Sequence, residues 1–101
     1  MKKYIVKSVN ILLQYDEDTK EIEIESNLIG TIDELIADAK IRCESEQQFD
    51  DYFNTMKMDV EPFNVATDVE NGEGYVDVTY HFTENGYTAA MDVSYMLEEE
   101  R

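Results

Sequence analysis

The chain has 101 residues and carries 24 acidic side chains against 8 lysines and arginines, a net charge of −16 at neutral pH. A disordered chain is not expected despite this charge, because 43% of the residues are hydrophobic, seven are Tyr and four are Phe. A chain of this length predicts one domain, residues 1–101, which buries roughly 65% of the surface that its unfolded form exposes. So acidic a surface argues against direct binding to nucleic acid, since phosphates require lysine and arginine.

The number of cysteines and the hydropathy of the chain indicate the cellular compartment in which the protein is expected. The single cysteine, Cys43, excludes an internal disulfide. No apolar stretch near the N-terminus has the length or the flanking residues of a signal peptide or a membrane span. We therefore expect a soluble, cytoplasmic protein that does not bind a membrane.

The first segment, residues 2–15, is predicted to be a long strand with apolar residues on one face: Ile5, Val9, Ile11 and Leu13. Residues 16–20 are polar and predict a turn. Residues 21–25 alternate strictly between Glu and Ile, which predicts a second strand.

Pairing these two strands in a hairpin sets their register. Leu13 is expected opposite Ile22 and Ile11 opposite Ile24, since residues directly opposite in a ladder share a face. The three glutamates between the isoleucines then point to the other face, about 6.6–6.8 Å apart: Glu21, Glu23 and Glu25.

Residues 31–56 carry two helix signals. Thr31 and Glu34 form a capping-box pattern, and apolar residues follow at helical spacing: Ile32, Leu35, Ile36, Ala39 and Cys43. Ser45 and Gln48 give a second cap pattern before another apolar stripe: Phe49, Tyr52, Phe53 and Met56. The two stripes are out of phase, so we expect two helices or one helix with a kink near Ser45.

The stretch from Met58 to Glu100 contains no lysine or arginine and predicts a three-stranded meander. Asn71-Gly72 and Asn85-Gly86 have the composition of two-residue hairpin turns. The first turn predicts the pairs Phe63 with Tyr80, Val65 with Val78, and Thr67 with Val76. The second predicts Phe82 with Ala89, Tyr80 with Met91, Val78 with Val93, and Val76 with Tyr95. Both registers select the same apolar face.

The opposite face of the meander is then polar and acidic, with a few apolar members: Asn64, Ala66, Asp68, Tyr75, Asp77, Thr79, His81, Thr88, Ala90, Asp92, Ser94 and Met96. Residues 97–101 are predicted to be a frayed tail. The fold class expected is α+β, with an antiparallel sheet of about five strands in the order ββα(α)βββ and one or two helices packed on one face.

A search for catalytic chemistry finds no pattern to support it. Cys43 lies on a predicted apolar helix stripe and His81 on a strand, and no spacing links them. The four glycines are assigned to the segment before the helix and to turns, so no phosphate-binding loop is expected. The acids at 16–18 with Glu21 lack the glycine and terminal glutamate of a calcium loop, and a turn is the better account. We predict no enzyme activity, catalytic residue, metal or cofactor.

The charge is the remaining functional signal. It predicts a partner that is a protein with a Lys/Arg-rich nucleic-acid-binding channel, although a merely solvated acidic surface stays an open alternative. The acids expected at that interface are Glu21, Glu23, Glu25, Glu44, Glu46, Asp50, Asp51, Asp68, Asp77 and Asp92. Tyr75 and Tyr87 are the expected aromatic anchors.

In size, acidity and mixed α+β pattern the chain resembles the small phage-encoded inhibitors of bacterial defence nucleases, the anti-CRISPR and DNA-mimic proteins. Residues 21–25, residues 44–51 and the acidic C-terminal half carry this resemblance. It implies a non-enzymatic inhibitor, active in the cytoplasm of a bacterial host cell, that occupies a nuclease's basic channel. The alternative is a homodimeric assembly domain that pairs through Ala66, Tyr75, Ala90 and Met96, with acidity serving solubility alone.

Overall fold

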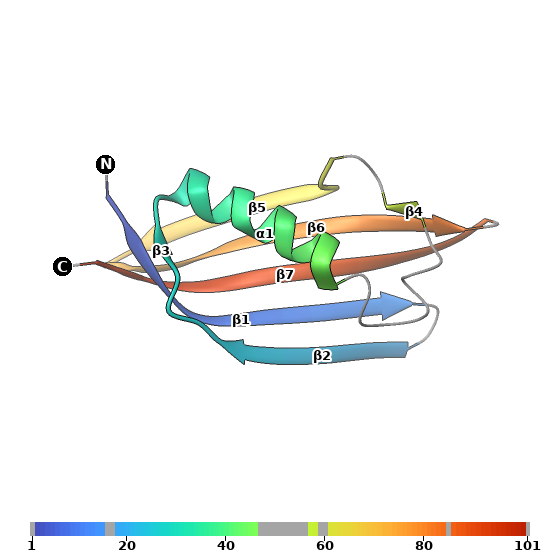
Figure 1. Ribbon diagram of the computed structural model, residues 1–101, viewed down its shortest axis with the longest axis horizontal. Coiled ribbons are helices and arrows are strands. Elements are labelled where there is room, and N and C mark those ends of the chain that lie inside the picture. The colour runs from blue at the N-terminus through green and yellow to red at the C-terminus, as the bar shows by residue number, and fades with distance from the viewer. Residues whose placement is uncertain (1, 16–17, 47–56, 59–60, 85, 101) are drawn as a thin grey trace.

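The computed structural model describes residues 2–15, 18–46, 57–58, 61–84 and 86–100. Its α+β fold places one helix across a long antiparallel sheet, and the two chain ends lie at the same end of the molecule (Figure 1). The dimensions along the principal axes are 47 × 22 × 20 Å.

The described residues form one helix, α1 (Ile32–Glu46), and seven strands: β1 (Tyr4–Tyr15), β2 (Asp18–Glu25), β3 (Ile29–Gly30), β4 (Lys57–Met58), β5 (Asn64–Glu70), β6 (Glu73–Glu84) and β7 (Tyr87–Glu99). Their order in the sheet is β2-β1-β7-β6-β4, with β3 beside β1 and β5 beside β6. The five long strands match the expected number. The two-residue strands β3 and β4 bring the total to seven, and segments this short leave no periodic signal in a sequence.

The hairpin of β1 and β2 forms in a register different from the predicted one. Ile11 lies opposite Ile22, and Leu13 lies opposite Lys20. Tyr15 pairs with Asp18, so the connection is shorter than the five-residue turn expected. A shift of two residues keeps every side chain on its face, and the three glutamates of β2 still point away from the core.

A β-bulge in β1 overturns the prediction for Ile5. The register against β7 shifts between Val6 and Ser8, which makes Lys7 the extra residue. An extra residue interrupts the alternation of the strand, so the odd-numbered residues after the bulge face the same side as the even-numbered residues before it. Val9, Ile11 and Leu13 face the core as predicted, but before the bulge the buried residues are Tyr4 and Val6.

The β6–β7 pairing follows the predicted register in full, and β5 pairs with β6 at Val65–Val78 and Thr67–Val76 as predicted. The prediction for Phe63 is wrong. Phe63 lies in a bend just before β5, is 64% exposed and stacks on the ring of His81 at 3.8 Å between centroids. His81 is on the face opposite α1, so the bend after Pro62 directs the Phe63 ring away from the core.

The predicted helix begins as expected. The Thr31 N–H donates to Glu34 Oε1 (3.0 Å), and the Glu34 N–H donates to Thr31 Oγ1 (3.3 Å), a capping box. Leu35, Ala39 and Cys43 are buried against the sheet. Ser45 does not start a second helix, because α1 continues to Glu46 and the Ser45 hydroxyl donates to the Ile41 carbonyl (3.2 Å). The rest of the predicted second helix, residues 47–56, lies outside the described residues.

The C-terminal strand is longer than predicted. β7 continues to Glu99, with Leu97 buried and the Glu99 N–H donating to the Gly72 carbonyl (2.7 Å), so part of the expected tail 97–101 lies within the sheet. Gly74 also differs from its prediction as a turn residue, since it lies inside β6 opposite Val69.

Candidate binding face

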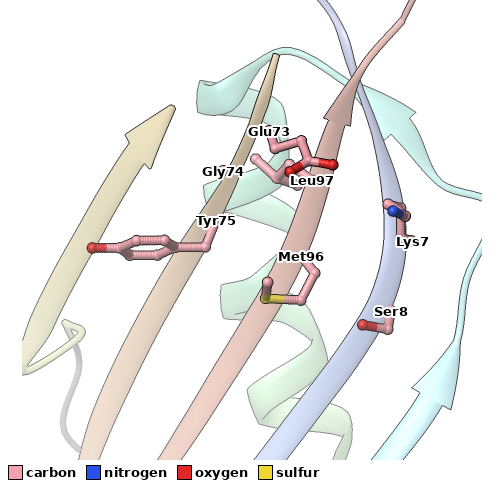
Figure 2. Close-up of a pocket in the computed structure, with 7 residues that line it drawn as sticks. All are labelled: Lys7, Ser8, Glu73, Gly74, Tyr75, Met96 and Leu97. Carbon is pink, nitrogen blue, oxygen red and sulfur yellow. The ribbon is translucent and has the colours of Figure 1, made fainter. Parts of the chain in front are cut away.

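The sheet face turned away from α1 gathers most of the acids that the strands carry. Strand alternation places nine carboxylates on it, and we call this surface the outer acidic face: Glu21, Glu23 and Glu25 of β2, Asp68 and Glu70 of β5, Glu73 and Asp77 of β6, and Asp92 and Glu98 of β7. Lys57 lies opposite Thr83 on this face, and Lys7 lines a pocket on it near the other end of the sheet. Figure 2 shows part of the face, with α1 behind the sheet. In the described strands, therefore, acids greatly outnumber cations here.

Cross-strand pairing brings acids from distant parts of the chain into rows. Glu70, Glu73 and Glu98 lie directly opposite one another on β5, β6 and β7. Paired Cβ atoms are about 4.5–5.5 Å apart, close enough for like charges to repel. Glu70, Glu73 and Glu98 are missing from the predicted interface, although the alternation used for Asp68, Asp77 and Asp92 places them on this face when it is continued along the same three strands.

At the centre of the face, Asp77 and Asp92 share a set of hydroxyl donors. Thr79 Oγ1 donates to Asp92 Oδ1 at 2.8 Å. Ser94 Oγ lies 3.0 Å from Asp77 Oδ1 and 3.4 Å from Asp92 Oδ2, so its hydrogen can serve either carboxylate. Burial, and secondarily the hydrogen bond and charge of Asp92, raise the pKa of Asp77 to about 6, against a smaller lowering by Ser94.

The raised pKa of Asp77 predicts a specific pH dependence of stability. Between about pH 4 and pH 6 the folded state retains a proton that the unfolded state has lost, so the free energy of unfolding falls as the pH rises. Asp77→Asn should remove this fall and increase the free energy of unfolding at pH 7 by about 1 kcal/mol. This gain is smaller than the full change in pKa would give, because Asp77 and Asp92 are partly hydrated. Urea unfolding from pH 3.5 to pH 8 measures the effect.

Asp68→Asn is the matched control, because it removes an exposed carboxylate from the same face. This variant should keep the fall between about pH 4 and pH 6. An equal pH dependence in Asp77→Asn and the unmodified protein would mean that the pKa of Asp77 is not raised as described.

The structure assembles only part of the predicted interface. Six of the ten predicted acids lie together on the outer acidic face. Glu44 lies on α1, across the sheet from it. The Glu46 side chain, Asp50 and Asp51 lie outside the described residues. The two predicted anchors are both solvent-facing, but Tyr75 is on the outer acidic face and Tyr87, at the β6–β7 turn, alternates onto the other face.

Cys43 and His81 lie on opposite sides of the sheet, so they do not form a catalytic pair. Cys43 is fully buried, with its Sγ 3.4 Å from Met91 Sδ, and burial raises its pKa to about 12. A thiol held protonated in this way is a poor nucleophile. Among the described residues no three histidine, cysteine or acidic side chains converge to hold a metal ion.

Comparison with known proteins gives no further assignment. No family model, curated protein or solved structure matches the chain. In the described ranges the one helix is neither long enough nor apolar enough to span a membrane.

Proposed function

We propose that the protein is a non-enzymatic binding protein whose outer acidic face occupies a Lys/Arg-lined nucleic-acid-binding surface of a partner protein. The observation that carries this proposal is the convergence of nine carboxylates, from four strands, on one face of the sheet. Charges gathered on one face create a directed field, which steers a cationic partner to that face and speeds its association.

The spacing of the carboxylates supports a nucleic-acid mimic. Along β2, Glu21, Glu23 and Glu25 are about 6.6–6.8 Å apart, roughly twice the 3.4 Å rise between phosphates on one DNA strand. The Asn10 amide donates to Glu21 Oε1 (3.2 Å) and so helps to fix the position of that carboxylate. A basic channel that follows a phosphate backbone could therefore pair with such a row.

The partner class that we propose is a nuclease or effector complex of a bacterial defence system, with the protein acting in the cytoplasm as a phage or mobile-element inhibitor. The support is the resemblance in size, acidity and α+β pattern to inhibitors of that kind. Such a protein competes with guide RNA or target DNA for the channel and needs no catalytic residue of its own.

The alternative, a homodimer that pairs through this face, meets an electrostatic obstacle. Met96 and Tyr75 are exposed there, but they lie among the carboxylates. A second copy docked on the same face would bring acid against acid, and desolvating unpaired like charges is costly. The charge of the face thus favours a cationic partner over a copy of the chain.

A kinetic experiment tests the proposal. A nuclease captured from a panel of defence nucleases should associate more slowly as salt increases from about 50 to about 300 mM, because salt screens the steering field. The triple variant Glu21→Gln, Glu23→Gln, Glu25→Gln should reduce the association rate constant at low salt by about tenfold.

The control removes the same number of charges from the opposite side of the molecule: Asp33→Asn, Glu44→Gln and Glu61→Gln. Asp33 and Glu44 are exposed on α1, and Glu61 reaches Lys40 of α1 at 3.9 Å. This variant should slow association much less than the β2 variant. An association rate that does not respond to salt, or equal effects of the two variants, would contradict the proposal.

A further inference from the structure

A pocket of about 420 Å³ opens on the outer acidic face, next to the bulge of β1. Figure 2 shows Met96 between Tyr75 on one side and Ser8 on the other, with the Tyr75 ring directed toward β5 and with Glu73 and Lys7 closer to the end of the sheet. Tyr75 is 39% exposed and Met96 50% exposed, so both offer apolar surface to a partner. A cavity of this size accepts a whole side chain.

Carboxylates surround this apolar surface on several sides. Strand pairing places Asp68 opposite Tyr75 and Glu25 opposite Ser8. Two further acids, Asp77 and Glu98, are two positions away from Tyr75 and Met96 on their own strands, and Glu73 lines the pocket. Each acid is thus about 5 to 7 Å from a lining residue, measured between Cβ atoms.

We infer that the pocket is an anchor site for an arginine side chain of the partner protein. The inference rests on the proposed function and names the partner residue that the outer acidic face selects. Arginine combines an aliphatic stem, which Met96 can cover, with a planar cation that stacks on an aromatic ring such as Tyr75. Its guanidinium also pairs with carboxylates through two parallel hydrogen bonds, and Asp68 lies directly opposite Tyr75 on β5.

Other side chains match the pocket less well. A lysine ammonium is compact and strongly hydrated, so it gains less from the Tyr75 ring and the Met96 surface. An uncharged aromatic side chain would fill the apolar part but leave the surrounding acids without a counter-charge. Lys7 contributes one opposing charge, which the five acids around the pocket outweigh.

Hexaarginine and hexalysine peptides test the inference, with dissociation constants measured by isothermal titration calorimetry on the full chain. We expect hexaarginine to bind about fivefold more tightly than hexalysine. Tyr75→Leu keeps an apolar side chain but removes the ring, so it should lower this ratio about threefold by weakening hexaarginine binding alone. Tyr87→Leu is the control, because Tyr87 is 63% exposed but lies outside the outer acidic face; it should leave the ratio unchanged.

Two outcomes separate this inference from the proposed function. If both peptides bind with strong salt dependence but Tyr75→Leu leaves the ratio unchanged, the arginine pocket is wrong and the acidic binding face stands. If neither peptide binds, both are overturned. Thermal unfolding of each variant establishes that the substitution at residue 75 leaves the fold intact.

Discussion

Gly74→Ala should destabilise the protein by about 3 kcal/mol or more, because strand β5 leaves no room for a side chain at this position. A Cβ built on Gly74 would be 2.2 Å from the Asp68 carbonyl oxygen and 2.8 Å from the Val69 Cα. Both atoms belong to the backbone, so β5 would have to move away from β6. Urea unfolding measures the loss as a lower midpoint.

Gly86→Ala provides the comparison. A Cβ at Gly86 would meet nothing within 4 Å, but the residue has φ +85°, which L-residues adopt only with strain. The expected cost is about 1–2 kcal/mol, from the backbone conformation alone. If Gly74→Ala costs no more than Gly86→Ala, β5 does not pack against β6 as closely as described.

Tyr95→Phe should cost about 2 kcal/mol, because it removes the hydroxyl that links the core of the sheet to α1. Tyr95 is fully buried, and its hydroxyl donates to Asp38 Oδ2 at 2.5 Å while accepting from Arg42 Nε at 3.3 Å. Hydrogen bonds to charged groups contribute about 1.5–3 kcal/mol. Tyr75→Phe, at an exposed site, should change the free energy of unfolding very little.

Tyr95→Phe should also alter how the free energy of unfolding depends on pH in the alkaline range. Burial, and then the hydrogen bond to Asp38, raise the pKa of Tyr95 above its ordinary value, an effect that Arg42 partly offsets. Above about pH 10 the unfolded state loses this proton while the folded state keeps it, so stability falls as the pH rises. Tyr95→Phe should weaken this fall, and an undiminished fall would mean that the pKa of Tyr95 is not raised as described.

Local backbone requirements explain which parts of the fold the sequence predicts well. Asn71, Gly72 and Gly86 have positive φ angles, which the Asn-Gly turns supply at little cost. A two-residue turn fixes the register of its strands, so both registers of the meander follow from the sequence. The β1–β2 connection has no such turn signal, and the register predicted for this hairpin is therefore wrong by two residues.

Other features depend on contacts that periodicity does not contain. Ile5 was misplaced because a bulge exchanges strand faces without changing the apolar pattern of Tyr4, Ile5 and Val6. Phe63 was misplaced because it stacks on His81, which no local rule predicts. In both cases a local irregularity of the backbone, the bulge in β1 and the bend before β5, decides which face receives the side chain.

The outer acidic face is a consequence of strand order. Each acid on it could be assigned to a strand and a side, but residues 21–25 meet the meander only because β1 pairs with β7. That pairing joins segments about eighty residues apart in the chain and has no sequence signature. The pocket beside Met96 arises from the same pairing, since the β1 bulge borders it.

Methyl NMR of Met96 and Ile41 during titration with hexalysine tests the central claim most directly. Met96 is exposed on the outer acidic face, while Ile41 is 62% exposed on α1, across the sheet. Binding at the outer acidic face should shift the Met96 methyl signal and leave the Ile41 signal in place. A shift of Ile41 without a shift of Met96 would place the binding surface on the helix side and contradict the account.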